Sequence, residues 1–143
     1  MINLFIASDH GGYHLKTTII NSMTNIVFND CGTFNETSVH YPCIADELCK
    51  QIQTNENSCG ILICGTGIGI SMRANRYTGI RAAVVHNEFT ATMAKAHNNA
   101  NILCLGGRVL TNETAISCIS AWLMTSFEGG RHQIRIDLID NHI

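Results

Sequence analysis

Residues 60–71 read GILICGTGIGIS, an apolar run that passes directly into three glycines at alternate positions. The residues that follow, SMRANR at 71–76, have helix-forming character. A short run that is apolar on both faces and ends in glycine is typical of a strand buried in a parallel sheet. Open α/β sheets bind ligands at the carboxyl ends of such strands, where glycines let backbone N–H groups approach an anion or a sugar. The stretch therefore predicts a strand, a ligand-binding loop and a helix, with the Cys64 thiol at the mouth of the loop.

The rest of the chain alternates in the same way. Besides the strand at 61–64, strands are predicted at residues 2–8, 26–28, 81–85 and 102–105. Helices are predicted at 13–23, from Pro42 to the polar stretch at 54–58, at 71–76, 87–97 and 112–127, with a last amphipathic segment at 131–143. Five strands alternating with helices imply a parallel sheet covered on both faces. The polar connection at 29–41 is longer than most loops of this kind and is a candidate for function.

Composition limits the class of protein. The chain has 143 residues, enough for one domain with a real core, and we expect a single domain over residues 1–143. Only 14% of residues are charged and the formal net charge is −2, which argues against a nucleic-acid binder and favours a small-molecule partner. No run approaches the roughly 18 apolar residues of a membrane span, and residues 1–8 lack a secretory signal pattern. We therefore expect a soluble, cytoplasmic protein with no membrane partner.

The cysteine pattern points away from both disulfides and metal. Seven cysteines are scattered along the chain, an odd number, and no C-x-x-C pair occurs. Neither a disulfide framework nor a zinc site is indicated, and no stretch supplies three or four ligands at metal spacing. We expect most of these thiols to be reduced and buried as small hydrophobic side chains.

Candidate chemical groups gather where the predicted strands end. Asp9 and His10 follow the first strand and Cys64 follows the third, so these groups should share the carboxyl edge of the sheet. His97 and Asn98 precede the fifth strand, at the far end of its helix, which places them at the opposite edge. One explanation is that His97 serves the site of a neighbouring subunit.

A pair of arginines forms the third cluster. Arg131 and Arg135 stand four residues apart, on one face of a predicted helix, with His132 beside them. Two guanidiniums on one helix face can act as a phosphate clamp. Three other arginines carry no such pattern and are interpreted as solvated surface residues: Arg73, Arg76 and Arg81.

Each signal also has a simpler interpretation. A glycine-rich turn often serves packing alone, a lone cysteine is more often structural than catalytic, and paired arginines commonly face solvent. The loop is not a nucleotide-binding motif, because Ile70 stands where G-x-G-x-x-G needs glycine and no Walker lysine follows. The joint occurrence of acid, imidazole, thiol, glycine loop and paired arginines in a chain with so few charges favours function.

Six stretches together resemble one family over nearly the whole chain: ASDHGG at 7–12, Tyr41-Pro42, GILICGTGIGIS at 60–71, GIRAAV at 79–84, HNNANILCLGGR at 97–108 and EGGRHQIR at 128–135. The chain resembles the type B ribose-5-phosphate isomerases of the ribose/galactose-phosphate isomerase family. This resemblance implies a Rossmann-like doubly wound fold and a homodimer or homotetramer with active sites shared between subunits. It implies interconversion of D-ribose 5-phosphate and D-ribulose 5-phosphate, in the non-oxidative pentose phosphate pathway, without a metal or organic cofactor.

The resemblance also implies residue roles. Cys64 would be the base that moves a proton between C1 and C2, and His97 the acid that opens the sugar ring. The sugar would be held by Asp9, His10, Tyr41, Gly65, Thr66, Gly67, Ile68, Gly69 and Asn98. The phosphate would be held by Arg108, Arg131 and Arg135.

Three departures from the family pattern bear on substrate choice. His40 and Cys43 stand at places that are commonly acidic, and Arg73 stands where a small residue is usual. Relatives acting on six-carbon sugar phosphates share the glycine loop, so an allose or galactose 6-phosphate isomerase is an alternative. Those acting on galactose 6-phosphate tend to lack the His-Asn pair and the GGRH cluster, which this chain keeps, and this favours the pentose phosphate.

Two other classes of function remain as alternatives. A flavodoxin-like nucleotide-binding module would share the sheet but would turn over no sugar phosphate. A thiol redox protein would use Cys64 as its oxidisable centre, but the nearest candidate partner, Cys59, stands at the other end of the same strand.

Overall fold

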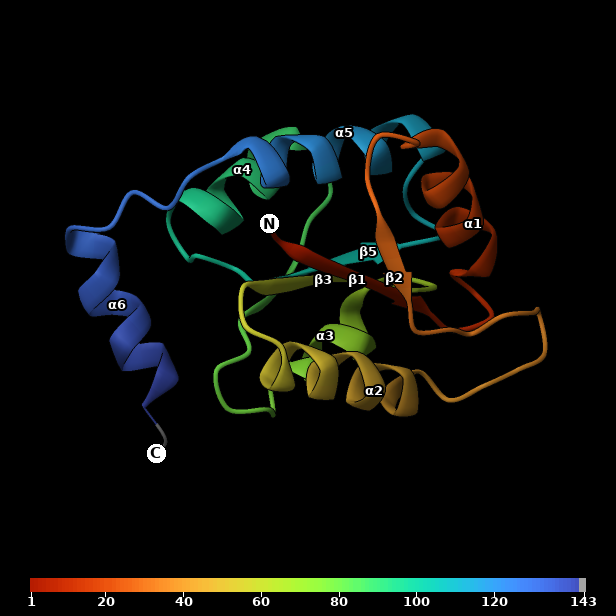
Figure 1. Cartoon of the computed structure of the whole chain (residues 1–143), viewed down its shortest axis with the longest axis horizontal. Helices are drawn as coiled ribbons and strands as arrows, with labels where there is room; N and C mark the ends of the chain where they lie inside the picture. Colours follow the sequence, from red (N-terminus) through yellow and green to blue (C-terminus); the bar gives the residue numbers. More distant parts are fainter. Residues whose placement is uncertain (142–143) are drawn as a thin grey trace.

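The computed structural model describes residues 1–141 and has a parallel sheet between two layers of helices, with a last helix set apart (Figure 1). The elements run in chain order as β1 Asn3–Ser8, α1 Tyr13–Ser22, β2 Phe28–Asp30, α2 Tyr41–Thr54, β3 Ser58–Cys64, α3 Ile68–Ala74, β4 Ala82–Val84, α4 Glu88–Ala96, β5 Ile102–Gly106, α5 Asn112–Met124 and α6 Arg131–Asp140. The strand order is β2-β1-β3-β5-β4, and every pairing is parallel. The predicted five-stranded, doubly wound α/β domain is confirmed.

The core lies on both faces of the central strands. In β3, Ile61 and Ile63 pack under α1, α4 and α5, whereas Leu62 and Cys64 pack under α2 and α3. All four side chains are buried, as an apolar run with no polar face requires. The two layers of helices are visible above and below the sheet in Figure 1.

The strand order reverses at the centre of the sheet. Strand β1 pairs with β3 on one side and β2 on the other, so the loops after β1 and β3 leave the carboxyl edge toward opposite layers. In doubly wound folds this switch point is where a ligand finds an open crevice. The two motifs expected to bind the ligand, at 9–12 and 64–69, follow these two strands.

Several predicted boundaries are wrong by two or three residues: β3 begins at Ser58 instead of residue 61, and α5 ends at Met124 instead of residue 127. Two further shifts have identifiable reasons. Strand β2 lies two residues beyond the predicted 26–28, because pairing with β1 sets its position and an edge strand can be polar: Leu4 pairs with Phe28 and Ile6 with Asp30. Helix α3 begins at Ile68 instead of residue 71, since the glycines of the loop continue into its first turn.

Helix α6 stands apart from both helical layers (Figure 1). Only His132 and Ile136 of this helix are buried, whereas Ile134, Leu138 and Ile139 are more than half exposed. The predicted segment extended to residue 143, and its last two residues lie outside the described chain. Within residues 1–141 no helix combines the length and the hydrophobicity needed to cross a bilayer.

Candidate active site

Three loops meet at the carboxyl edge of the sheet. The backbone of the loop after β5 is hydrogen-bonded to the loop after β3, through Gly107 N to Cys64 O at 2.8 Å and Arg108 N to Gly65 O at 3.0 Å. The loop after β1 closes on itself, because Gly12 N donates to the buried Asp9 Oδ1 at 3.1 Å. This edge therefore holds Asp9, the glycine loop and Arg108 in one rigid backbone frame.

Arg108 lies directly over the glycines of this edge. A β-carbon on Gly65 would come within 2.9 Å of Arg108 Nη1, and one on Gly11 within 3.4 Å of Nη2. A side chain at residue 65 would displace the guanidinium from its present position, whereas the distance at residue 11 is an ordinary van der Waals contact. A fixed cation beside the loop's N–H groups suits a phosphate or a developing oxyanion.

The Cys64 sulfur is set into the loop as an acceptor. Gly67 N donates to Cys64 Sγ at 3.1 Å, and the thiol is only 4% exposed. Gly67 holds this orientation with φ +78°, and a β-carbon there would lie 3.0 Å from the Leu105 carbonyl carbon. The sulfur therefore accepts a hydrogen bond inside the loop, and the thiolate is the form of a cysteine that can take a proton.

Three other buried cysteines are held in the thiol form by their surroundings. Burial raises the pKa of Cys49 to about 12 and that of Cys59 to about 11. Burial, together with Cys64 and Cys49, also raises the pKa of Cys104. All seven cysteines are free, and five of them are buried, as expected. Cys59 packs on the opposite face of the sheet from Cys64, which excludes it as a resolving thiol in this fold.

The long connection after β2 supplies the outer wall of the site. Directly after it, Tyr41 at the start of α2 packs on the glycine loop so closely that a β-carbon on Gly69 would lie 2.6 Å from the Tyr41 Cζ atom. In the same connection Val39 N donates to His10 Nδ1 at 3.2 Å. This bond uses Nδ1 as an acceptor, so Nε2 is the ring nitrogen that remains available as a donor. Thr66 Oγ1 accepts from Ile68 N at 3.3 Å, which shapes the turn between them.

His97 and Asn98 lie at the other edge of the sheet. His97 is the C-cap of α4, and β5 begins five residues later, so in an all-parallel sheet the pair sits at the amino edge. Strand β3 has seven residues, which corresponds to a rise of roughly 20 Å between the two edges. A single sugar phosphate cannot reach Cys64 and His97 of the same chain.

The start of α6 joins His97 at this amino edge. Glu128 N donates to Ala96 O at 3.0 Å, and Gly129 and Gly130, both with positive φ, turn the chain into the helix. The His132 ring then stacks on the His97 ring, with centroids 4.2 Å apart and planes 11° apart. Glu128 Oε2 lies 3.3 Å from His132 Nε2 and 3.8 Å from His97 Nε2.

The electrostatics of this cluster favour the neutral form of His132. Burial is the main cause that lowers the pKa of His132, and the nearby His97 and Arg131 act in the same direction against Glu128. Arg131 and Arg135 themselves are exposed on α6. The sequence pattern singled out these arginines but not Glu128, although its spacing of four residues from His132 is a signal that could have identified it.

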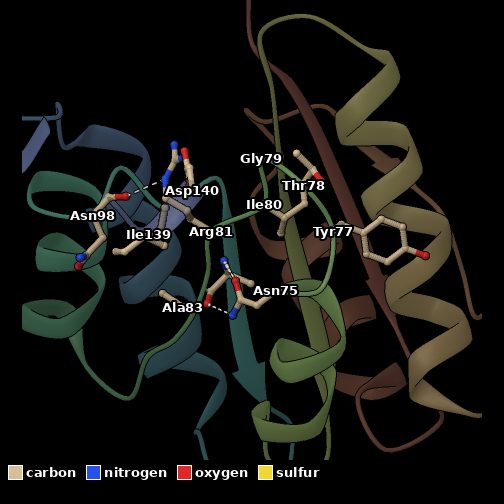
Figure 2. Close-up of a pocket in the computed structure, with 12 residues that line it drawn as sticks. Asn75, Tyr77, Thr78, Gly79, Ile80, Arg81, Ala83, Asn98, Ile139 and Asp140 are labelled. Atoms are coloured by element: carbon tan, nitrogen blue, oxygen red, sulfur yellow. Dashed lines mark hydrogen bonds and ion pairs between the residues drawn. The ribbon is translucent and has the colours of Figure 1, made fainter. Parts of the chain in front are cut away.

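Arg81 was interpreted as a solvated surface residue, and this is wrong. Its guanidinium donates to Asn98 O at 3.0 Å through Nε, to Asn99 O at 3.1 Å through Nη2, and to Asp140 Oδ2 at 2.7 Å through Nη1. Arg81, Asn98 and Asp140 line a pocket of about 360 Å³ between β4 and the end of α6 (Figure 2). Arg81 therefore ties α6 to the turn that carries His97, including Asn99 in its left-handed conformation at φ +43°.

Three residues depart from the family pattern, and they lie outside these two clusters. Arg73 forms an ion pair with Asp46, with Nε to Oδ1 at 2.7 Å, and so joins α3 to α2. Cys43 is exposed in the first turn of α2, and His40 is the N-cap of that helix.

Comparisons with known proteins agree on one family. The ribose/galactose isomerase family matches residues 4–139. Ribose-5-P isomerase B of Listeria innocua is 40% identical over 141 residues, which cover 97% of this chain and 95% of that protein. The crystal structure of a ribose 5-phosphate isomerase from Thermotoga maritima is similar with a TM-score of 0.94 and 45% identity, covering 97% of each chain. That of ribose-5-phosphate isomerase B from Mycoplasma genitalium with bound ribulose-5-phosphate has a TM-score of 0.85 and 41% identity, covering 97% of this chain and 94% of the other.

Proposed function

Because the chain belongs to the ribose/galactose isomerase family, we propose that it interconverts D-ribose 5-phosphate and D-ribulose 5-phosphate. The observation that carries the proposal is the Cys64 thiol, which accepts a backbone N–H inside the glycine loop at the switch point of the sheet. A relative with 41% identity was crystallised with ribulose-5-phosphate, the ketose partner of this reaction.

The proposed reaction has three steps that named groups can perform. His97 donates a proton to the ring oxygen and opens the furanose, since an imidazole both gives and accepts protons near neutral pH. The Cys64 thiolate then removes the proton from C2 of the aldose and returns it to C1, while a hydroxyl proton passes from O2 to O1, so that C1 becomes an alcohol and C2 a ketone. Backbone N–H groups of residues 65–70, other than those of Gly67 and Ile68 that already donate to side chains, stabilise the enediolate oxygen, a contribution typically of about 3 kcal/mol for one well-placed donor.

The phosphate is assigned to the arginines. Arg108 lies at the carboxyl edge, and Arg131 and Arg135 are exposed on α6. Phosphate binding far from the reacting carbons positions C1 and C2 against Cys64, so its binding energy contributes to catalysis.

We further propose that the working enzyme is a dimer, or a tetramer built from such dimers, with each site shared between two subunits. Cys64 and His97 of one chain are separated by the height of the sheet, so each half-site needs its complement from a second copy. Helix α6 projects from the body with exposed apolar side chains, among them Ile134 and Leu138, which a second subunit would cover (Figure 1).

The test is an assay of the purified protein against ribose 5-phosphate, allose 6-phosphate and galactose 6-phosphate, with the ketose product measured directly. The proposal expects ribose 5-phosphate to have the largest kcat/KM. A larger value with a six-carbon substrate would assign the alternative sugar, and no turnover of any of the three would refute isomerase function.

Catalysis is expected to need no metal ion, because thiolate, imidazole and backbone N–H groups account for each step. Activity should survive exhaustive dialysis against a chelator, measured as kcat and KM before and after. Loss of activity that an added divalent ion restores would contradict the mechanism.

Gly69→Ala is expected to lower kcat/KM by roughly tenfold to a hundredfold, because its new methyl group would push Tyr41 out of the wall of the site. The backbone at residue 69 has no left-handed strain, so the effect is steric. The control is a double-mutant cycle: in a Tyr41→Ala background the same substitution should cost far less. If Gly69→Ala lowered kcat/KM equally in both backgrounds, contact of the new methyl group with Tyr41 would not be the cause of the loss.

Arg81→Ala is expected to lower kcat/KM by at least about tenfold, because α6 and the His97 turn lose their common anchor. Arg81→Lys keeps the charge but cannot reach all three acceptors, and should recover only part of the loss. Arg76→Ala, on an exposed arginine, is the matched control and should leave kcat/KM unchanged. Full activity in Arg81→Ala would show that α6 is positioned by other contacts.

A further inference from the structure

We propose that His97, Glu128 and His132 form a binding site for a divalent transition-metal ion of the Zn²⁺ class, and that occupancy of this site inhibits the enzyme. One donor atom from each of the three side chains lies within 4.8 Å of the other two. Two imidazoles and one carboxylate are a ligand set that zinc accepts, with a fourth position left open.

The distances are close to those of a coordinated ion. Ligand atoms on a tetrahedral ion with bonds of roughly 2.0–2.1 Å are about 3.3 Å apart. Glu128 Oε2 and His132 Nε2 already stand 3.3 Å apart, and Glu128 Oε2 and His97 Nε2 3.8 Å apart. The remaining adjustment is a rotation of His97, whose ring now lies parallel to that of His132.

A second observation points to a missing ligand. His132 is only 5% exposed, and its Nε2 atom has no hydrogen-bond partner among residues 1–141 although it faces the Glu128 carboxylate. A buried polar atom without a partner is unfavourable, and a metal ion would satisfy it. Residues 97 and 128 have the freedom to complete the site, since their side chains are 36% and 54% exposed.

The site is held together by backbone contacts that do not depend on the side chains. His97 N donates to Met93 O at 2.9 Å, and Glu128 N donates to Ala96 O at 3.0 Å, so the end of α4 and the start of α6 stay in register. The spacing of Glu128 and His132 is one helical turn. The three ligands are therefore presented by a preformed scaffold.

The neighbourhood selects the kind of ion. The exposed cation Arg131 adjoins His132, so hard ions that depend on negative charge, such as Mg²⁺ and Ca²⁺, are disfavoured by a site with a single carboxylate. Imidazole ligands favour Zn²⁺, Co²⁺, Ni²⁺ and Cu²⁺. The two imidazole ligands thus favour transition-metal ions over Mg²⁺ and Ca²⁺.

Inhibition follows from the proposed isomerase function, on which this part of the inference rests. A metal ion bound to Nε2 of His97 occupies the nitrogen that would donate a proton to the ring oxygen. Metal binding itself does not depend on that function, so the two claims can be tested separately.

Binding is tested with Co²⁺ added to chelator-treated protein, which should develop visible d–d absorption without the near-ultraviolet charge-transfer band of a thiolate ligand. Zn²⁺ should displace the cobalt. Glu128→Gln keeps the size of the side chain but removes its charge, and should weaken binding at least tenfold, as should His132→Asn. The matched control is Glu36→Gln, which alters a surface His–Glu pair with His14. This pair has no third ligand within residues 1–141, so the variant should leave binding unchanged.

The exposed thiol Cys43 is the competing site, and Cys43→Ser controls for it. Equal cobalt binding by wild type and Glu128→Gln, or loss of binding in Cys43→Ser, would overturn the proposal. In the isomerase assay, Zn²⁺ should inhibit the wild-type enzyme reversibly. Half-inhibition of Glu128→Gln should require a Zn²⁺ concentration at least ten times higher. Zinc bound at the three ligands without inhibition would overturn the inhibitory role, and would also remove His97 from the ring-opening step.

Discussion

Cys64→Ala is expected to lower kcat by about two to four orders of magnitude with a much smaller change in KM. The thiol is the one buried cysteine that accepts a backbone N–H from the glycine loop, with Gly67 N at 3.1 Å, whereas burial raises the pKa of Cys49 and Cys59. Removing it should leave the phosphate contacts and the loop in place, so binding survives while proton transfer fails. Steady-state kinetics with ribose 5-phosphate would measure both quantities.

Two variants control for this result. Cys64→Ser should be nearly as poor as the alanine variant, because a hydroxyl is far less acidic than a thiol and is rarely ionised at neutral pH. Cys59→Ala removes a buried thiol from the other end of the same strand and should keep kcat while it lowers the melting temperature. Near-normal turnover in Cys64→Ala would transfer the role of base to another residue, with Asp9 the first to test.

The chemistry of Cys64 can also be traced in the product. A base that moves a carbon-bound proton should leave deuterium at C1 or C2 of substrate recovered from heavy water, to an extent set by how fast the protonated thiol exchanges. Intact-mass measurement should show no stable sugar adduct, because no acyl or phosphoryl group is transferred through the thiol. An adduct on Cys64 would instead identify a covalent nucleophile.

The carboxyl edge of the site was predictable from the sequence, because local patterns determine it. An apolar run that ends in glycines specifies a buried strand and a close-approach loop, and the alternation of strands and helices specifies which loops share an edge. Asp9 and the glycine loop therefore lie where the pattern indicated. The polar edge strand β2 was misplaced because its position is set by pairing with β1 and not by its own residues.

The amino edge was only partly predictable, because its contacts join distant residues. Arg81 bonds to Asp140, 59 residues away, and although it lies in the GIRAAV stretch that carries part of the family resemblance, no local pattern reveals this distant partner. The cluster of His97, Glu128 and His132 likewise forms only when α6 folds back beside the end of α4. The expectation that no metal-ligand set exists was drawn from linear spacing, which cannot detect ligands brought together by tertiary structure.

Mixing two inactive variants, Cys64→Ala and His97→Ala, is expected to regenerate activity. His97 lies at the amino edge and Cys64 at the carboxyl edge, so each chain contributes one half of two different sites. In a symmetric dimer of the two variants, one site carries both lesions and the other carries none. A purified heterodimer should therefore have about half the activity of wild type, because one of its two sites is intact.

The matched control pairs two lesions at the same edge. Arg108 lies over the loop that contains Cys64, so both residues belong to the same half-site. In a heterodimer of Cys64→Ala with Arg108→Ala, each of the two sites therefore carries one lesion. The activity of this heterodimer should stay at the level of the two parent variants. Differently tagged chains, refolded together and purified on both tags, provide heterodimers of known composition. If verified heterodimers of Cys64→Ala with His97→Ala remain as inactive as the parents, the site is not shared between subunits. His97 cannot reach Cys64 within one chain, because the parallel sheet lies between them. The role of ring-opening acid would then pass to a group at the carboxyl edge. His10 is the imidazole to test first, because it adjoins Asp9 at that edge.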